Sequence, residues 1–395
     1  MSARYDAIVL GAGAAGLMAA ARAGQRGRRV LLLERASKPG KKILISGGGR
    51  CNFTNLGAGP EHYLSGNPHF AKSALSRYTA RDFLELVESY GIAWHEKTLG
   101  QLFCDGSAKQ IVDLLLEECA KGDASVRCDE DVTSVERTNS GFRVTSNGTD
   151  YAADALVIAT GGPSIPKMGA TGFAYDLARQ FGLAIVEPRP ALVPLTLGGE
   201  EVLFRTISGV AAPVTVGAGS GKRKASFAEA ALFTHKGLSG PAILQASSYW
   251  APGEEVVVNF LPDERGDWLL AEKAARPRAG LRSVLRERLP DRLADMLAER
   301  LELPDSLQAA SDKALRQAQE RLARWTFRPS GTEGFAKAEV TAGGIATSEL
   351  SSRTMEAKRV PGLYAVGEAV DVTGWLGGYN FQWAWASGVA CGEAL

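Results

Sequence analysis

The chain has 395 residues, of which 45% are apolar and 23% are charged, and its formal net charge is +1. This length allows more than one hydrophobic core, and this composition is ordinary for a globular protein. The balanced charge argues against a protein whose whole surface binds nucleic acid or acidic membrane, although it leaves room for a local basic patch.

Cysteine and histidine usage indicates neither a disulfide framework nor a metal site. No two of the five cysteines are spaced as CxxC, and their odd number fits a reducing compartment. The four histidines are scattered without metal-ligand spacing. We therefore expect no metal site. From MSAR the chain passes directly into an apolar segment and then glycines, so we expect no signal peptide and no membrane span. These features together predict a cytoplasmic enzyme.

The first segment has the pattern of a dinucleotide-binding unit. An apolar strand at 5–10 precedes GAGAAG at 11–16, a helix to residue 26, and a strand RVLLLE at 29–34 that ends in an acid. The first glycine permits the tight turn, the second lets pyrophosphate approach, the third lets the helix pack on the strand, and the acid binds the adenosine ribose. The expected contacts come from Gly11, Gly13, Ala14, Ala15, Gly16, Glu34 and Arg35.

The segment after this unit favours a flavin over a nicotinamide dinucleotide. It reads RASKPGKKILISGGGRCNFTN and lacks the third strand and helix of a nicotinamide domain; instead, cationic residues bracket three glycines. An extended FAD would pass over this backbone, which carries no side chains, and the cations would neutralise its pyrophosphate. The expected contacts are Lys41, Lys42, Ser46, Gly47, Gly48, Gly49, Arg50, Cys51 and Asn52.

Two later segments complete such a domain. A buried strand at 154–162 leads into a glycine turn, and the segment 362–388 contains a strand, Gly367–Glu368, and a helix opened by two glycines. We expect Glu368 to hold the ribityl hydroxyls and the helix start to stabilise the negative charge of reduced flavin at its N1/C2=O edge. The residues expected to contact FAD are Thr160, Gly161, Gly162, Gly367, Glu368, Asp371, Gly378, Asn380 and Phe381.

With these motifs, the sequence resembles the YhiN/HI0933-like flavoproteins, also called BaiN-type NAD(P)/FAD-dependent oxidoreductases. The motifs that carry the resemblance span nearly the whole chain: GAGAAG at 11–16, KKILISGGGRCNFTN at 41–55, ATGG at 159–162, RPALVPL at 189–195, FTHKGLSGPAIL at 233–244, VTAGGI at 340–345 and GGYNFQWAWASG at 377–388. The resemblance implies a discontinuous, Rossmann-like α/β FAD-binding domain with an inserted β-barrel-like domain and a small α-helical domain. It also implies adenine contacts near Val132 and the reduction of activated C=C bonds, in substrates as different as steroid-like enones and ribosomal RNA uridine.

The expected domains are an FAD-binding domain at 1–190 and 331–395, a β-rich domain at 191–263 and a helical domain at 264–330. Within the first, we predict helices over 70–120 and a β-meander over 126–145. Within the second, GAGSGKRK at 217–224 is interpreted as a hairpin turn, because it lacks the spacing and following helix of a phosphate loop.

The catalytic residues stay open at this stage, with Cys51, His235 and Tyr379 as candidates. Cys51 is interpreted either as a redox or acid group beside the flavin or, preferably, as a small packed residue, since no resolving cysteine lies at CxxC distance. His235 could donate a proton or merely stabilise its turn. Arg278, Arg282 and Arg286 are spaced as one basic helical face, which is either a solvated surface or a contact for RNA.

No second dinucleotide-binding unit occurs in the sequence, so NAD(P)H is expected to visit the flavin transiently and to deliver hydride to N5. The preferred hypothesis is a reductase of an activated C=C bond in a small molecule or in RNA. The alternatives are an FAD-dependent amine oxidase and a non-catalytic, flavin-containing RNA-binding protein.

Overall fold

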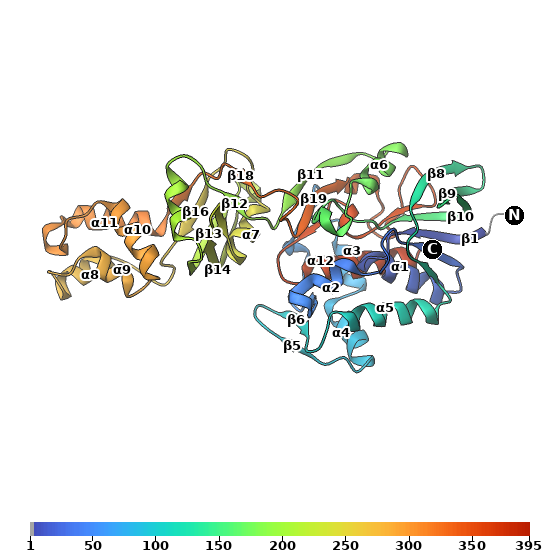
Figure 1. Cartoon of the computed structure of the whole chain (residues 1–395), viewed down its shortest axis with the longest axis horizontal. Coiled ribbons are helices and arrows are strands. Elements are labelled where there is room, and N and C mark those ends of the chain that lie inside the picture. The colour runs from blue at the N-terminus through green and yellow to red at the C-terminus, as the bar shows by residue number, and fades with distance from the viewer. Residues whose placement is uncertain (1–3) are drawn as a thin grey trace. The chain divides into compact units, whose positions relative to one another are not determined.

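The computed structural model describes residues 4–395, and the chain divides into two compact units. Unit 1 comprises Met1–Arg189 and Val340–Leu395, and unit 2 comprises Pro190–Glu339 (Figure 1). The sequence predicts the inserted domains over 191–330, whereas unit 2 begins one residue earlier, at Pro190, and continues to Glu339.

Unit 1 is organised around a seven-stranded sheet of order β7-β2-β1-β10-β9-β8, with β20 paired to β10. The strands β1, β2, β7, β10 and β20 are parallel, and β8 and β9 form the expected antiparallel meander with β10. Their bounds are β1 Arg4–Leu10, β2 Val30–Leu33, β7 Ser125–Arg127, β8 Val132–Thr138, β9 Gly141–Ser146, β10 Thr149–Ile158 and β20 Leu363–Ala365.

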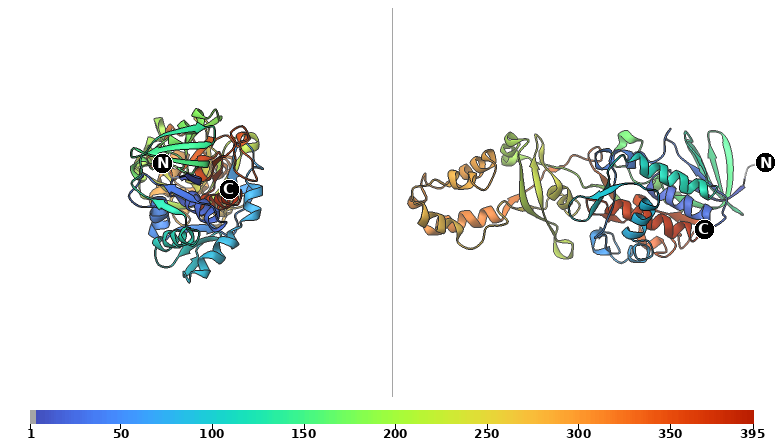
Figure 2. Two further views of the ribbon diagram at one scale, coloured as in Figure 1. Left: turned by 90° about the vertical axis from the view of Figure 1, so that its right-hand side faces the viewer. Right: turned by 90° about the horizontal axis from the view of Figure 1, so that it is seen from below.

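Two long helices, α1 (Ala14–Gln25) and α12 (Tyr379–Gly392), pack directly against each other beside this sheet (Figure 2). Glycines permit this close approach, because a Cβ on Gly388 or on Gly392 would lie 2.7 Å from a backbone oxygen of α1. The buried Trp383 and Trp385 of α12 bind other segments: their indole N–H groups donate to the carbonyls of Gly367 and Phe53. Helix α12 therefore fixes the loops that carry the predicted site.

The remaining elements of unit 1 surround these helices. A three-stranded sheet has the order β3-β6-β5, β4 pairs with β21, and β11 pairs with β19. The bounds are α2 Lys41–Ile45, β3 Asn52–Asn55, β4 Tyr63–Leu64, α3 Lys72–Arg77, α4 Ala80–Ser89, β5 Trp94–Glu96, β6 Gln101–Cys104, α5 Lys109–Lys121, α6 Phe173–Gln180, β11 Ile185–Ala191, β19 Val340–Ile345 and β21 Thr373–Gly374.

The prediction of helices throughout 70–120 is wrong between α4 and α5. There the chain forms β5 and β6, and β6 pairs with β3 from the glycine-rich segment. The helical period of the flanking segments dominated the sequence pattern, while β5 and β6 are only three and four residues long. Strands this short are stabilised by a partner that the local sequence does not contain.

Unit 2 combines one antiparallel sheet, of order β17-β16-β13-β14-β15-β12-β18, with a helical part. The predicted hairpin at 217–224 is confirmed, since Ala218 of β13 pairs with Ala225 of β14. Rings of Phe204, Phe233, Phe260 and Phe327 pack together in its core. The bounds are β12 Leu195–Thr196, β13 Ala211–Ala218, β14 Ala225–Phe233, β15 Gly237–Ser239, α7 Pro241–Ser247, β16 Val256–Asn259, β17 Trp325–Phe327 and β18 Gly331–Thr332.

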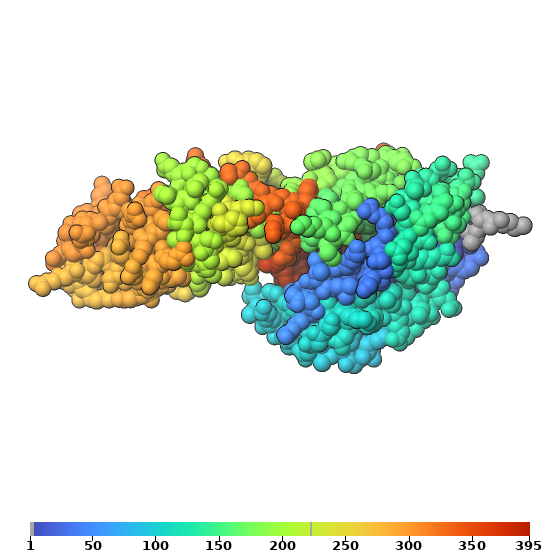
Figure 3. Space-filling model, in the orientation of Figure 1, coloured from blue at the N-terminus to red at the C-terminus, as the bar shows by residue number. Residues whose placement is uncertain are grey.

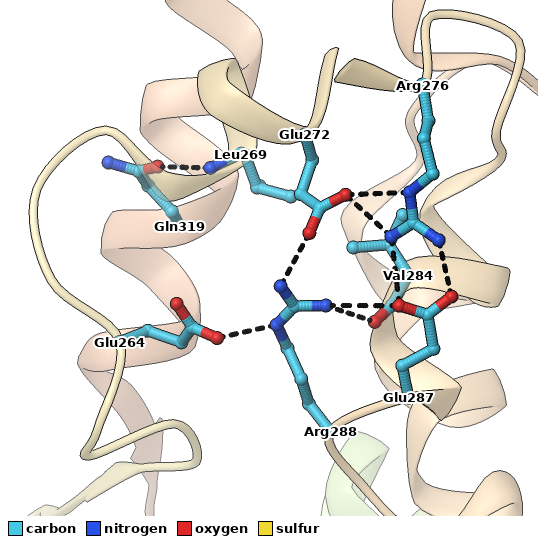
Figure 4. A network of polar contacts seen from close by, with 8 residues as sticks. All are labelled: Glu264, Leu269, Glu272, Arg276, Val284, Glu287, Arg288 and Gln319. Carbon is cyan, nitrogen blue, oxygen red and sulfur yellow. Dashed lines mark hydrogen bonds and ion pairs between the residues drawn. The ribbon is translucent and has the colours of Figure 1, made fainter. Parts of the chain in front are cut away.

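The helical part of unit 2 consists of α8 (Trp268–Ala275), α9 (Leu281–Arg286), α10 (Asp291–Leu301) and α11 (Asp312–Ala323). It ends before the predicted residue 330, because Trp325–Phe327 joins the sheet as β17. Figure 4 shows how acids engage its arginines: Arg288 bonds to Glu264 and Glu272, both at 2.6 Å, and Arg276 bonds to Glu272 and Glu287.

The single basic helical face predicted from Arg278, Arg282 and Arg286 is wrong. Arg278 lies in the loop before α9, whose N-cap is Gly280, so the three residues do not share one helix. Arg286 forms a bidentate contact with Asp295 of α10, and Arg282 lies 3.7 Å from the same carboxylate. Pro277 and Gly280 interrupt the helical spacing that the sequence suggested.

Candidate functional site

The loop between β1 and α1 has the geometry that its three glycines predict. Gly11 has φ of 102°, and a Cβ on Gly16 would lie 1.9 Å from the backbone oxygen of Gly11. A Cβ on Gly13, in contrast, would meet no atom within 4 Å. Gly13 is the N-cap of α1, and no side chain caps this helix start. The first N–H groups of α1 are therefore available to an anion such as a pyrophosphate.

Glu34 ties this loop to the segment that follows β2. Its carboxylate accepts hydrogen bonds from the N–H of Ala12 (2.7 Å) and from its neighbour Ala36 (2.8 Å). Each carboxylate oxygen retains a further lone pair, so a ribose hydroxyl can still donate to it. The predicted ribose contact is compatible with this arrangement and stays a prediction, as does any contact by the exposed Arg35.

The three consecutive glycines have two separate physical reasons. Gly47, Gly48 and Gly49 have φ of 56°, 66° and 87°, values at which a side chain is strained. A Cβ on Gly47 would also lie 2.8 Å from the ring of Phe103, whereas one on Gly48 would meet nothing within 4 Å. The segment from α2 to this loop lies at the surface of unit 1 (Figure 3). Left-handed backbone and the close approach of Phe103 account for these glycines, and the clearance for a ligand that the sequence suggested stays a prediction.

Cys51, which follows this loop, is fully buried. Burial raises the pKa of its thiol to about 12, although a hydrogen bond from Ser46 lowers it in part. A reactive thiol needs a thiolate and access, and this thiol has neither at neutral pH. The geometry favours the interpretation of Cys51 as a packed residue. Of its neighbours, Arg50 is exposed and Ser46 is half-buried.

Lys42 and Glu368, predicted separately as FAD contacts, form an ion pair of 2.5 Å. The Glu368 carboxylate also accepts from the Ser164 hydroxyl (2.6 Å) and from the N–H of Thr341 (2.9 Å). Burial opposes its charge, but Lys42 and these hydrogen bonds together hold its pKa below the ordinary value. Ser164 and Thr341 were missed, although both stand next to or within glycine motifs of the sequence. Lys41 instead reaches the carbonyl of Met168 at 3.4 Å.

Beside this ion pair lie buried hydroxyl groups without a hydrogen-bond partner in the described chain: those of Thr160, Tyr175 and Thr341. A Cβ on Gly162 would lie 2.5 Å from the Thr341 hydroxyl and 2.7 Å from that of Tyr175. An unsatisfied buried hydroxyl costs about 1–3 kcal/mol, so a polar ligand is expected to pair with such groups. The ribityl and phosphate oxygens of FAD have this chemistry, and the residues therefore fit FAD. Tyr175 was not predicted.

The start of α12 is a second helix N-terminus without a side-chain cap. Its N-cap, Gly378, has φ of 94°, and a Cβ there would lie 2.4 Å from the carbonyl oxygen of Thr54 in β3. The Asn380 side chain turns back to the preceding loop, since its amide bonds both the N–H (2.8 Å) and the carbonyl (2.9 Å) of Gly374. The predicted stabilisation of negative charge at the flavin edge is therefore left to the backbone N–H groups of Asn380 and Phe381.

A buried asparagine that the sequence did not single out joins three loops at this helix start. The Asn55 amide donates to the carbonyls of Leu99 (3.0 Å) and Gly377 (2.9 Å), and it accepts from the N–H of Gly57 (2.9 Å). The predicted Asn52 contacts the side-chain amide of Gln101 at 3.1 Å. Asn55 thus holds the loop before α12 in place, whereas Asn52 contacts β6.

Tyr379, the third catalytic candidate, belongs to an aromatic cluster with His62 and Trp375. The ring centroid of His62 lies 4.6 Å from that of Trp375 and 4.9 Å from that of Tyr379. The backbone carbonyl of Tyr379 accepts a hydrogen bond from the hydroxyl of Tyr63 at 2.9 Å. This cluster of His62, Trp375 and Tyr379 is called the His62 cluster below. His62 and Trp375 were both missed by the sequence reasoning.

The remaining predicted residues are less informative. Burial raises the pKa of Asp371, while the N–H of Gly66 (2.8 Å) and the charge of Arg189 oppose this rise. Val132 begins β8, Gly161 has φ of 71°, and Gly367 donates its N–H to Ser387 at 3.0 Å. His235 lies exposed in the turn between β14 and β15 of unit 2.

Residues 4–395 contain neither a metal-binding cluster nor a membrane-spanning helix. No group of three or more histidine, cysteine, aspartate or glutamate side chains there could hold a metal ion. Within the same residues, no helix is both long and apolar enough to cross a membrane.

Comparison with known proteins gives full-length matches. A family model, the HI0933-like protein Rossmann domain, matches residues 5–394. The chain is 53% identical to the ribosomal RNA dihydrouridine synthase of Escherichia coli (strain K12), over 99% of this chain and 98% of that protein. It is 46% identical to the protein of the same name from Haemophilus influenzae, over 100% and 99%. It is 30% identical to the 3-dehydro-bile acid delta(4,6)-reductase of Clostridium scindens, over 98% of both chains.

Among solved structures, the 3-ketosteroid-Δ4-(5α)-dehydrogenase of Rhodococcus jostii RHA1 superposes with a TM-score of 0.50, covering 99% of this chain and 97% of that one. At 14% identity this likeness concerns the fold alone. It agrees with the predicted α/β, Rossmann-like architecture.

Proposed function

The chain belongs to the HI0933-like family of FAD-dependent oxidoreductases, and from this membership we propose that it uses NAD(P)H to reduce the C5=C6 bond of a uridine in ribosomal RNA. The observation that carries the proposal is the identity of 53% and 46% to two ribosomal RNA dihydrouridine synthases along their whole length. The relative that acts on a bile acid is more distant, at 30%. With ribosomal RNA as the substrate, the proposal includes a cytoplasmic reaction.

The cofactor site in this proposal uses groups that the fold leaves available. The start of α1 binds the pyrophosphate, Glu34 binds the ribose, and the unpartnered hydroxyls of Thr160, Tyr175 and Thr341 bond the polar middle of FAD. The start of α12 stabilises negative charge at the far end. When bound, the flavin supplies a hydride from N5. The protein contributes position, charge and exclusion of water.

NAD(P)H is proposed as a transient visitor, since the sequence contains one dinucleotide-binding unit and FAD would occupy it. The hydride donor would bind, reduce the flavin and leave before the RNA base enters. This order predicts that flavin reduction needs no RNA.

A second candidate is the reduction of a small-molecule enone, favoured by the 30% identity to the bile acid reductase over 98% of the chain. The two substrates share one chemical feature, a C=C bond conjugated to a carbonyl, so one flavin site can serve either. The relatives named above lend no support to the amine oxidase or to the non-catalytic RNA-binding protein.

The test begins with anaerobic mixing of the holoenzyme with NADH and, separately, with NADPH, following the oxidised flavin band at about 450 nm. Bleaching by either one is expected. Ribosomal RNA from cells lacking the gene is then added, and dihydrouridine is measured by mass spectrometry of the digested nucleosides. Bleaching without dihydrouridine, but with reduction of a steroid enone, would favour the second candidate. No bleaching by both nucleotides would overturn the reductase proposal.

A further inference from the structure

The His62 cluster lies at the helix start that the proposed function assigns to the reacting end of the flavin. Tyr379 is the first residue of α12, and its ring lies 4.9 Å from that of His62 and 6.2 Å from that of Trp375. The pairing of β4 with β21 brings these segments together: Gly374 pairs with Tyr63, and the N–H of Trp375 donates to the carbonyl of His62 at 3.1 Å. The cluster therefore lies beside this helix start.

One nitrogen of His62 is engaged and the other is free. Nδ1 lies 3.2 Å from both the N–H and the carbonyl oxygen of Gly59, and 3.6 Å from a carboxylate oxygen of Glu61. Nε2 has no hydrogen-bond partner among residues 4–395. The side chain is 19% exposed, so it is held in place by the two rings and still reached by water. This is the environment of a histidine that can exchange a proton.

Reduction of a conjugated C=C bond needs a proton donor as well as a hydride. The hydride adds to the carbon β to the carbonyl, and a proton must add to the α carbon. Two other protic groups near α12 are poor donors. Cys51 is fully buried, and the Tyr63 hydroxyl is buried and already donates to Tyr379.

We propose that His62 is a catalytic residue, which donates the proton from Nε2 to the substrate, and that Trp375 holds the imidazole in position for this transfer. The inference rests on the proposed function, because it requires a substrate with a C=C bond conjugated to a carbonyl. In the uridine case the hydride, originating from NAD(P)H, forms the new C6–H bond. The Nε2–H bond of imidazolium breaks, the C5–H bond forms, and the C5=C6 pair of electrons is consumed. The neutral imidazole is then protonated again by water.

The local charges fit this cycle. In the imidazolium form, Nδ1–H can donate to the Gly59 carbonyl, and a carboxylate oxygen of Glu61 lies 3.6 Å from Nδ1. After transfer, the neutral ring keeps its Nδ1–H, which can still donate to the Gly59 carbonyl. The same turn thus accommodates both states of the ring without rearranging the aromatic contacts.

The experiment separates the two half-reactions in His62→Gln holoenzyme. FAD content, the visible spectrum and the rate of bleaching by NAD(P)H are expected to match the wild type. Reoxidation of the reduced flavin by substrate is expected to slow by about 100-fold or more, the usual contribution of a positioned acid. His69→Gln serves as the matched control, since His69 is an exposed histidine of the same unit outside the cluster. This variant should match the wild type both in flavin bleaching by NAD(P)H and in reoxidation by substrate.

A second variant, His62→Phe, retains a ring between Trp375 and Tyr379 but cannot donate a proton. If both variants lose FAD, His62 is a structural residue and the inference is overturned. Reoxidation by substrate within about threefold of wild type would likewise overturn it, while leaving the proposed function intact. Failure of the wild type to be bleached by NAD(P)H would refute the proposed function itself, and such a result is distinguishable from either outcome.

Discussion

The two helix starts of unit 1 look alike in sequence and differ in structure. Both α1 and α12 begin after a glycine N-cap without a side-chain cap. A Cβ on Gly13 would meet no atom within 4 Å, whereas a Cβ on Gly378 would lie 2.4 Å from the carbonyl oxygen of Thr54. Gly378 also has a left-handed backbone, with φ of 94°. The first glycine thus leaves room for a ligand, and the second leaves room for the protein's own chain. A glycine before a helix has different consequences depending on what the fold brings to it.

The largest expected effect follows from Gly378→Ala. The added methyl would lie 2.4 Å from a backbone oxygen, at φ of 94°, so β3 and α12 must separate. We expect the free energy of unfolding to fall by about 3 kcal/mol or more, together with loss of FAD. Urea denaturation followed by tryptophan fluorescence measures this change. Gly172→Ala at the N-cap of α6, where a Cβ meets nothing within 4 Å, is the matched control and should change stability by less than about 1 kcal/mol.

Gly13→Ala should have the opposite signature. Its backbone has φ of −81°, and the methyl meets no protein atom, so the apoprotein should unfold within about 1 kcal/mol of the wild type. The methyl would occupy the room assigned to the pyrophosphate, and FAD affinity should fall by about tenfold or more, equivalent to about 1.4 kcal/mol. Titration of apoprotein with FAD, followed by flavin fluorescence, measures it. Equal FAD affinity in variant and wild type would contradict the assignment of the pyrophosphate to this loop.

A smaller effect is expected from Lys42→Met, which tests the ion pair between Lys42 and Glu368. Removing the cation leaves the Glu368 carboxylate partly buried without its partner, at an expected cost of about 1–2 kcal/mol at neutral pH, since both groups keep some solvent. The pKa of Glu368 is lowered in the folded state, so its contribution is present above the ordinary carboxyl pKa and is lost as the pH falls through the lowered value. The stability difference between wild type and variant should therefore shrink under acid conditions. A difference that is independent of pH would refute the ion-pair explanation.

The smallest effect should come from Cys51→Ala. The thiol is buried, and its pKa is raised to about 12, so we expect substrate turnover within about twofold of the wild type and a loss of about 1 kcal/mol in stability. Steady-state kinetics and thermal unfolding check both. Turnover reduced about 100-fold with full FAD content would restore Cys51 as the acid and weaken the case for His62.

The sequence predicted the local structure around the start of α1 nearly in full. The glycine spacing, the acid after β2 and the strands on either side are contiguous, and the structure places them as the pattern indicates. The sequence also indicated that Glu368 follows a strand and that Gly378 opens a helix, as the structure has them. It did not reveal that Glu368 pairs with Lys42, 326 positions earlier, or that Asn55 joins three loops.

The failures have identifiable physical reasons. Strands β5 and β6 are too short to show a period of their own, and they exist because β3 pairs with β6. The predicted basic face of Arg278, Arg282 and Arg286 is wrong because no helix continues across Gly280. In addition, Asp295 of α10 pairs with Arg282 and Arg286. The partners β3 and Asp295 come from elsewhere in the chain, whereas the break at Gly280 is local.

What the sequence determined by itself is the family, the fold class and the backbone of the dinucleotide loop, since local backbone conformation is encoded in contiguous residues. Only the tertiary structure decided which side chains share the α12 end. His62 and Trp375 meet there because β4 pairs with β21, a contact between segments about 300 residues apart that no local pattern records.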